Sequence, residues 1–240
     1  MARKIAFLVF MLILFAAGAG YMGLNSPFFS VKEVQALGLA RLRADDVVEA
    51  AGIEKGTNIF RVDLGKAAER VAGNPWVRSV TLRRRLPATV EIVVTERAAV
   101  AAMPYYSSYV LLDEDGWALE VVRDLPALPL VTGEDVPEVT VGSQVDSEGL
   151  RGAIACASAF GPRANEVSEV HADRSGEITA YIAGGITALV GRPDSTLTRR
   201  VGLLLGILQD VRSTKIPVKV IDVRYEKPVV RLKAPFAKGG

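Results

Sequence analysis

The residues best suited to chemistry are scarce in this chain. Among 240 residues there is one histidine, His171, and one cysteine, Cys156. An internal disulfide and a His/Cys metal site are therefore excluded, and only an all-oxygen metal site remains open. His171 follows a strand-like pattern with Glu169 as its only local partner, so we expect an ordinary strand histidine rather than a member of a catalytic triad. Cys156 falls in an alanine-rich predicted helix, which favours a buried, inert thiol.

Three further motifs have a formal link to chemistry, and each has a simpler interpretation. Gly18-x-Gly20-x-x-Gly23 matches the dinucleotide fingerprint, but it lies inside an apolar run without the required strand and acidic residue. The acidic stretch Asp113–Gly116 lacks the spacing of a calcium-binding EF-hand, so we expect a solvated turn. Arg83–Arg85 could bind anionic lipid or a partner, but a solvated hairpin tip is the better prediction.

No enzyme signature accompanies these residues. Neither a Gly-x-Ser-x-Gly elbow nor a Ser-x-x-Lys pair occurs. We therefore expect no catalytic residues, no cofactor, no metal ion and no small-molecule substrate. The 29 basic and 27 acidic residues give a net charge of +2, which argues against a nucleic-acid partner.

An uncharged apolar run near the N-terminus predicts a membrane helix over residues 5–24. At about 1.5 Å per residue the run spans about 30 Å, the thickness of the hydrocarbon core. Arg3 and Lys4 precede it, so the positive-inside rule places residues 1–4 in the cytoplasm and the later domains outside it. The residues of this predicted membrane anchor include Ile5, Leu14, Tyr21 and Leu24.

A cleaved signal peptide is the alternative for the same segment. Ala17-Gly18-Ala19 resembles a cleavage site, but the apolar run continues beyond it through Tyr21 and Leu24. We favour the uncleaved, single-pass anchor. Both interpretations export the remainder of the chain.

The exported part divides into two predicted domains of the α+β class. Residues 28–97 are expected to form a strand, two helices and a β-hairpin. Ala44, Val47 and Ala51 recur on one face of the first helix, and Asp63 is a good N-cap for the second.

Residues 100–233 are expected to form a mainly antiparallel β domain with flanking helices, followed by a polar tail at 234–240. Helices are predicted near 147–160 and 196–211. Strands are predicted around 109–112, 117–119, 128–131, 167–172, 178–182, 186–190, 218–225 and 229–232.

Four motifs in this order resemble the FtsQ/DivIB family of bacterial cell-division proteins and its FtsQ-type POTRA domain. In this sequence they read Phe29-x-Val31-x-x-Val34-x-x-Leu37-Gly38, Gly56-x-Asn58-Ile59-Phe60-x-Val62-Asp63, Asn74-Pro75-Trp76-Val77 and Pro87-x-Thr89-x-x-Ile92-x-Val94-x-Glu96-Arg97. A fifth, Asp222-x-Arg224-Tyr225, resembles the end of the family's second β domain. The sequence departs from the pattern at Ala98, where the family usually has proline.

The resemblance implies a bitopic inner-membrane scaffold of the division machinery, at the division septum, that is not an enzyme. Such a protein would bind the FtsB/FtsL pair and other divisome components, and help link early division proteins to septal peptidoglycan synthesis. The resemblance also implies that the partner binds to a C-terminal edge strand. The candidate binding residues on that strand are Arg224, Tyr225, Lys227, Val229 and Arg231. For Tyr225 the alternative is a core aromatic. Pro228 should force a turn or bulge nearby.

Two other functions remain as alternatives. One is an exported POTRA-bearing assembly or secretion component, although the residues after position 100 are few for an outer-membrane barrel. The other is a peptidoglycan-acting enzyme whose carboxylates the sequence does not single out.

Overall fold

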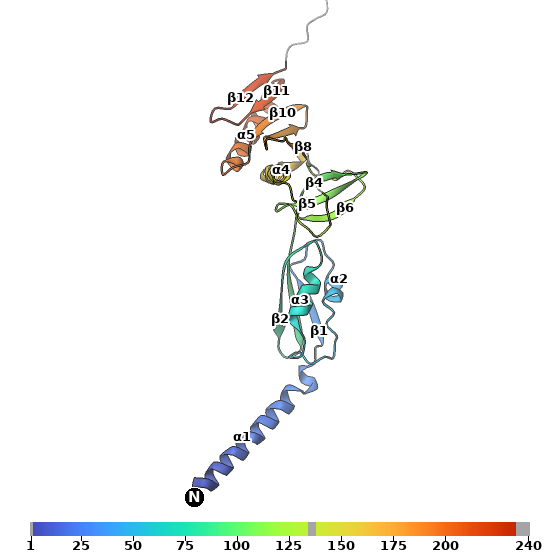
Figure 1. Cartoon of the computed structure of the whole chain (residues 1–240), viewed down its shortest axis with the longest axis vertical. Helices are drawn as coiled ribbons and strands as arrows, with labels where there is room; N and C mark the ends of the chain where they lie inside the picture. Colours follow the sequence, from blue (N-terminus) through green and yellow to red (C-terminus); the bar gives the residue numbers. More distant parts are fainter. Residues whose placement is uncertain (1, 134–137, 234–240) are drawn as a thin grey trace, which may run out of the picture. The chain divides into compact units, whose positions relative to one another are not determined.

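The structure is a computed structural model that describes residues 2–133 and 138–233. The polar tail expected at residues 234–240 lies outside the described residues. The chain divides into two compact units, Met1–Arg97 and Ala98–Gly240, each with its own sheet and core (Figure 1).

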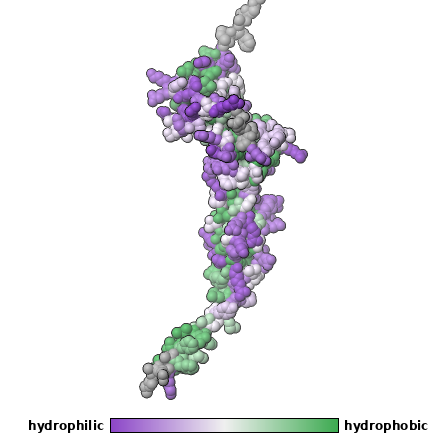
Figure 2. Space-filling view, in the orientation of Figure 1, coloured by the Kyte–Doolittle hydropathy of each residue, from purple (hydrophilic) through white to green (hydrophobic). Residues whose placement is uncertain are grey.

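The first unit begins with the helix α1, Ala2–Leu24, which includes part of the predicted cytoplasmic stub. Its apolar side chains are exposed, Ile5, Leu14, Tyr21 and Leu24 among them, and Figure 2 shows its hydrophobic surface in green. Within the described residues it is the one helix long and apolar enough to cross a membrane. It fits a single-pass membrane protein with an extracytoplasmic domain.

The rest of the first unit has the predicted order of strand, two helices and two strands. A short 3-10 turn, η1 (Pro27–Phe29), precedes it. The elements are β1 (Glu33–Leu37), α2 (Ala44–Ala51), α3 (Leu64–Ala72), β2 (Val77–Arg85) and β3 (Thr89–Glu96). The sheet order is β1-β3-β2, with β1 parallel and β2 antiparallel to β3. The spacing of Phe29, Val31 and Val34 is strand-like, but β1 begins only at Glu33. Ser26 caps a turn that has Pro27 in its first position, and the Val31 N–H donates to the Thr57 carbonyl instead of to a strand.

The predicted helix faces form the core of this domain. Val47 and Ala51 from α2 and Val71 from α3 are buried with Ile92 and Val94 from the central strand. Asp63 caps α3 by accepting a hydrogen bond from the Lys66 backbone N–H at 3.1 Å. Two short helices thus cover one face of a three-stranded sheet.

Arg83–Arg85 are exposed beside the hairpin turn, as expected, but their guanidinium groups are paired within the domain. β2 continues through Arg85, and Arg83 Nε donates to Glu91 Oε2 at 2.6 Å while Arg85 pairs with the other oxygen. The Glu91 side chain is 7% exposed, and the hydrogen bond from Arg83 lowers its pKa. Arg84 reaches a different segment, donating from Nε to the Ile59 carbonyl and from Nη2 to the Val62 carbonyl, both at 2.7 Å.

The second unit is a mixed α+β domain built on one open sheet. Its elements are β4 (Ala99–Tyr105), β5 (Ser108–Asp113), β6 (Ala118–Val122), β7 (Leu130–Gly133), α4 (Glu148–Ala159), η2 (Gly161–Glu166), β8 (Val167–Ala172), β9 (Ile178–Ile182), β10 (Ile186–Gly191), α5 (Leu197–Thr214), β11 (Val218–Asp222) and β12 (Val229–Leu232).

The strand order in this sheet is β12-β11-β10-β9-β8-β7-β4-β5-β6. Neighbours are antiparallel except β10/β11, β7/β8 and β4/β7, so the sheet is mainly antiparallel as expected. The strand β4 was not predicted. Helix α4 packs on β4, β7 and β8, and α5 packs on β10 and on α4. Phe160, Ile154, Leu204, Leu208 and Ile221 are fully buried in this core.

The two Arg84 hydrogen bonds generate a stability prediction. Replacing Arg84 by Met should keep the apolar stem but leave the Ile59 and Val62 carbonyls without this donor. We expect the first unit to lose about 2 kcal/mol of unfolding free energy. Urea titration of the full chain in detergent, read by hydrogen exchange of peptides from residues 29–97, measures it.

Arg43→Met is the matched control. Arg43 is exposed in the same domain, and its side chain makes no cap hydrogen bond to α2. An equal loss in both variants would contradict a specific role for the Arg84 bonds.

Candidate partner-binding edge

The C-terminal hairpin supplies an open edge of the large sheet. Among the described strands, β12 pairs with β11 alone and stands at one end of the strand order. All four β12 residues are exposed, including Val229 at 49% and Leu232 at 57%. The expected site residues Val229 and Arg231 therefore lie in an edge strand.

The outer rim of β12 presents defined main-chain donors. The Lys233 backbone N–H donates inward to the Pro217 carbonyl at 2.7 Å. Because N–H directions alternate along an antiparallel strand, the Val230 and Leu232 N–H groups point to the open side. An added strand would find these donors unpaired by β11.

The prediction that Arg224, Tyr225 and Lys227 lie in a strand is wrong. β11 ends at Asp222, and residues 224–227 form a bend before β12 begins at Val229. Pro228, which has no N–H for a ladder, precedes β12, in agreement with the expected turn. These three site residues thus lie in the turn next to the open edge, while Val229 and Arg231 lie on it.

Asp222 and Arg224 form a clasp that shapes this turn. Asp222 Oδ1 accepts hydrogen bonds from the Arg224 backbone N–H at 3.1 Å and from its Nε at 3.0 Å, and Oδ2 accepts from Nη2 at 2.7 Å. These bonds lower the pKa of Asp222 and raise the pKa of Arg224. Glu177 on the neighbouring loop adds a weaker ion pair to Arg224 at 3.8 Å.

Gly191 at the end of β10 allows the clasp to pack closely. Its φ is +84°, and a Cβ there would lie 3.0 Å from Arg224 Cγ and 2.8 Å from Arg200 Nη1. A larger residue would meet both arginines and a strained backbone. A positive φ at position 191 cannot be recognised from the sequence, so Gly191 is not among the site residues predicted from it.

Tyr225 is exposed rather than buried. Its side chain is 65% exposed, and the Arg224 guanidinium lies 5.6 Å from the ring centroid. The core-aromatic alternative is therefore wrong for Tyr225. The ring is available for contact with another molecule beside the edge.

His171 lies in a hydrogen-bonded row on adjacent strands, away from this hairpin. Thr132 Oγ1 donates to Glu169 Oε1 at 2.6 Å and lies 2.8 Å from His171 Nδ1. Since the threonine proton goes to Glu169, the hydroxyl accepts from His171 Nδ1–H, the reverse of a base activating a nucleophile. The sequence does not identify Thr132 as a partner of His171, because only the pairing of β7 with β8 brings the two residues together.

The remaining candidates have structural roles. Cys156 is fully buried, and desolvation raises its pKa to about 12, so the thiol is inert at neutral pH. Asp113 is buried, not solvated as expected, and accepts hydrogen bonds from the Asp115 and Trp117 N–H groups. Among the described residues, no cluster of His, Cys, Asp or Glu could hold a metal ion.

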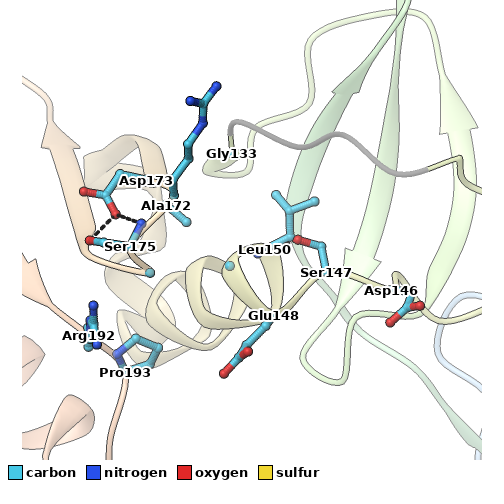
Figure 3. A pocket seen from close by; sticks show the side chains of 13 residues that line it. Gly133, Asp146, Ser147, Glu148, Leu150, Ala172, Asp173, Ser175, Arg192 and Pro193 are labelled. Carbon is cyan, nitrogen blue, oxygen red and sulfur yellow. Dashed lines mark hydrogen bonds between the residues drawn. The ribbon is translucent and has the colours of Figure 1, made fainter.

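A hollow at the start of α4 has polar lining but its hydroxyl groups are occupied (Figure 3). Ser147 caps α4 by accepting from the Leu150 N–H, and Ser175 donates to Asp173 at 2.7 Å. These bonds give both hydroxyls a structural role in the local turns. The open edge of β12 is the better candidate for a functional site.

Comparison with known families agrees with the two-unit division. Residues 29–97 match the model of the POTRA domain, FtsQ-type, and residues 102–224 match that of the cell division protein FtsQ/DivIB, C-terminal. The second match ends at Arg224, within the clasp.

Individual relatives are division proteins. The chain is 27% identical to cell division protein DivIB of Clostridium acetobutylicum, over 53% of this chain and 52% of that one. It is 27% identical to cell division protein FtsQ of Geotalea daltonii, over 86% and 76%. It is 33% identical to cell division protein FtsQ of Myxococcus fulvus, over 72% and 62%. The matched region thus spans about half to three quarters of these relatives.

The clasp generates a pH prediction. Because the pKa of Asp222 is lowered in the folded state, its stabilising effect should be complete above the unfolded pKa of about 4 and decline as pH falls through the folded value. Asp222→Asn should cost on the order of 1 kcal/mol at pH 7 and progressively less at lower pH. Urea titrations at pH 7 and pH 3, read by hydrogen exchange of peptides from residues 186–233, compare the two chains.

Asp210→Asn is the control, because Asp210 is an exposed carboxylate of α5 whose side chain is outside the clasp. The difference in unfolding free energy between the wild-type chain and Asp222→Asn should be smaller at pH 3 than at pH 7. An equal difference at both pH values would contradict an ionic interaction between Asp222 and Arg224.

Proposed function

This chain belongs to the FtsQ/DivIB family of cell-division proteins, and on that premise we propose that it is a single-pass scaffold of the divisome that binds an FtsB/FtsL-like pair. The N-terminus would lie in the cytoplasm and the two exported units beyond the inner membrane, at the septum. There the chain would help link early division proteins to septal peptidoglycan synthesis. Its role would be binding and not catalysis.

The open edge of β12 is the observation that carries this proposal. An edge strand offers unpaired N–H and C=O groups, and a partner segment can join the sheet by main-chain pairing. The outward donors of Val230 and Leu232 supply one side of such a ladder. Val229, Val230 and Leu232 add exposed apolar surface for a partner to cover.

The adjacent turn would add selectivity to this pairing. Tyr225 presents an exposed aromatic ring, and aromatic and arginine side chains often dominate binding energy. Arg224 is held in place by Asp222, so little of its conformational freedom remains to be lost on binding. Lys227 is exposed beside them and could pair with an acidic partner residue.

Blocking an outward donor tests the edge directly. Val230→Pro should remove one donor from the open side while leaving the inward hydrogen bonds to β11 in place. We expect the affinity for the FtsB/FtsL pair of the same organism to fall about tenfold or more, which corresponds to about 1.4 kcal/mol. Titration of the full chain in nanodiscs measures this affinity.

Val230→Ala is the control, because it shortens the side chain but keeps the N–H. In cells depleted of the native chain, Val230→Ala should restore division whereas Val230→Pro should leave filaments. Normal affinity and normal division with Val230→Pro, in a folded chain, would refute binding at this edge.

The exposed tyrosine gives a separate prediction. Tyr225→Ala should weaken binding of the same pair about tenfold without unfolding the second unit, because an exposed ring contributes little to the core. Tyr106→Ala, at a tyrosine that is 95% exposed, should leave affinity unchanged. Equal affinities for the two variants in the nanodisc titration would remove Tyr225 from the site.

A further inference from the structure

Exposed apolar side chains collect at the end of the POTRA domain that is joined to α1. Phe28 is 60% exposed, Phe60 is 42% exposed and Leu86 is 59% exposed. We infer that this end of the domain inserts into the headgroup region of the bilayer that α1 crosses, with these three side chains at the boundary with the acyl chains. The inference rests on α1 being the membrane anchor of the proposed function.

Covalent connectivity keeps this end of the domain near the bilayer. Phe28 is four residues beyond Leu24, the last residue of α1, so even a fully extended connection reaches only about 14 Å. That upper limit is about twice the depth of one headgroup region, which extends about 5–8 Å beyond a hydrocarbon core of about 30 Å, and the 3-10 turn η1 shortens the connection further. Phe28 therefore cannot move far from the interface while α1 remains inserted.

Hydrogen bonds also hold a second loop at the end of α1. Asn58 Nδ2 donates to the Leu24 carbonyl at 2.7 Å, and Arg61 Nη2 donates to Asn25 Oδ1 at 2.8 Å. Phe60 lies between these two residues in the sequence. The loop that carries Phe60 is thus fastened to the last turn of the membrane helix.

Packing within the domain brings the apolar side chains to the same end. The Phe29 ring lies 5.1 Å from the Phe28 ring and 5.2 Å from the Phe60 ring, measured between centroids. Leu86 is in the turn between β2 and β3. The N–H groups of Lys32 and Glu33, where β1 begins, donate to the carbonyl of Ala88 in the same turn.

The chemistry of this surface suits a lipid interface. In interfacial amphipathic helices, Phe and Leu are among the side chains that are buried at the boundary between headgroups and acyl chains. Lys32, Lys55 and Arg61 are exposed near the same loops and can approach lipid phosphates, with Glu33 and Glu54 as their acidic neighbours. Basic side chains outnumber acidic ones only slightly here. We therefore expect that insertion of the apolar side chains, and not attraction to anionic lipid, holds this end of the domain at the bilayer.

Quenching by brominated lipid tests this placement. Phe60→Trp and Leu86→Trp are introduced singly into the full chain, which is reconstituted in phosphatidylcholine vesicles with or without brominated acyl chains. The unchanged chain, with Trp76 and Trp117, sets the background. We expect brominated lipid to reduce the added emission of both variants at least twofold.

Two further variants separate the inference from the anchor itself. Tyr21→Trp reports on α1, and Tyr106→Trp reports on an exposed site in the second unit that should remain unquenched. Quenching of Tyr21→Trp without quenching of either Phe60→Trp or Leu86→Trp overturns the interfacial contact and leaves the anchor intact. Absence of quenching at Tyr21→Trp refutes the anchor and, with it, the inference.

Discussion

Main-chain pairing across the large sheet is the constraint on which the second unit depends. Every internal strand pairs with two neighbours, because a backbone N–H or C=O group that is left unpaired in the interior costs free energy. The pair β11/β12 joins this sheet only through the parallel register of β10 with β11, which includes Thr187 opposite Val220. That parallel step requires a crossover, and α5 supplies it. The open edge therefore exists because α5 carries the chain across the face of the sheet.

The turn after β11 depends on the same register. Pairing places the end of β10, and with it Gly191, beside the end of β11. Because no side chain stands at position 191, the aliphatic part of Arg224 can pack there while its guanidinium faces Asp222. The clasp then ends the strand at a defined residue, and the chain returns as β12. Sheet register, a glycine conformation and one ion pair together set the position of the exposed ring of Tyr225.

Local patterns in the sequence were sufficient to predict the helices but not every strand. Apolar residues at helical spacing identified α2, α3 and α5, because each helix buries one face. The strand β4 was missed, since its alanines and Pro104 are typical of neither an alternating strand nor a helix. Glu91 alternates with the apolar residues Val90 and Ile92, a pattern typical of a solvent-facing side chain, yet its carboxylate is 7% exposed and pairs with Arg83 and Arg85. The motif at Asp222–Tyr225 located the candidate site, but its place in a turn follows from pairing between distant segments, which no local pattern contains.

An edge strand alone would be a poor recognition device. Main-chain hydrogen bonds are common to all sequences, so any extended segment could pair with β12, and exposed edges also promote unwanted association. Selection must come from side chains near the edge, and here the turn supplies a tyrosine, a fixed arginine and a lysine. A clasp formed before binding reduces the ordering cost when a partner arrives. Binding of this kind uses main-chain pairing at the edge and side-chain contacts at the turn, and neither needs a reactive group. The near-neutral charge of the chain and its single histidine and cysteine are consistent with such binding.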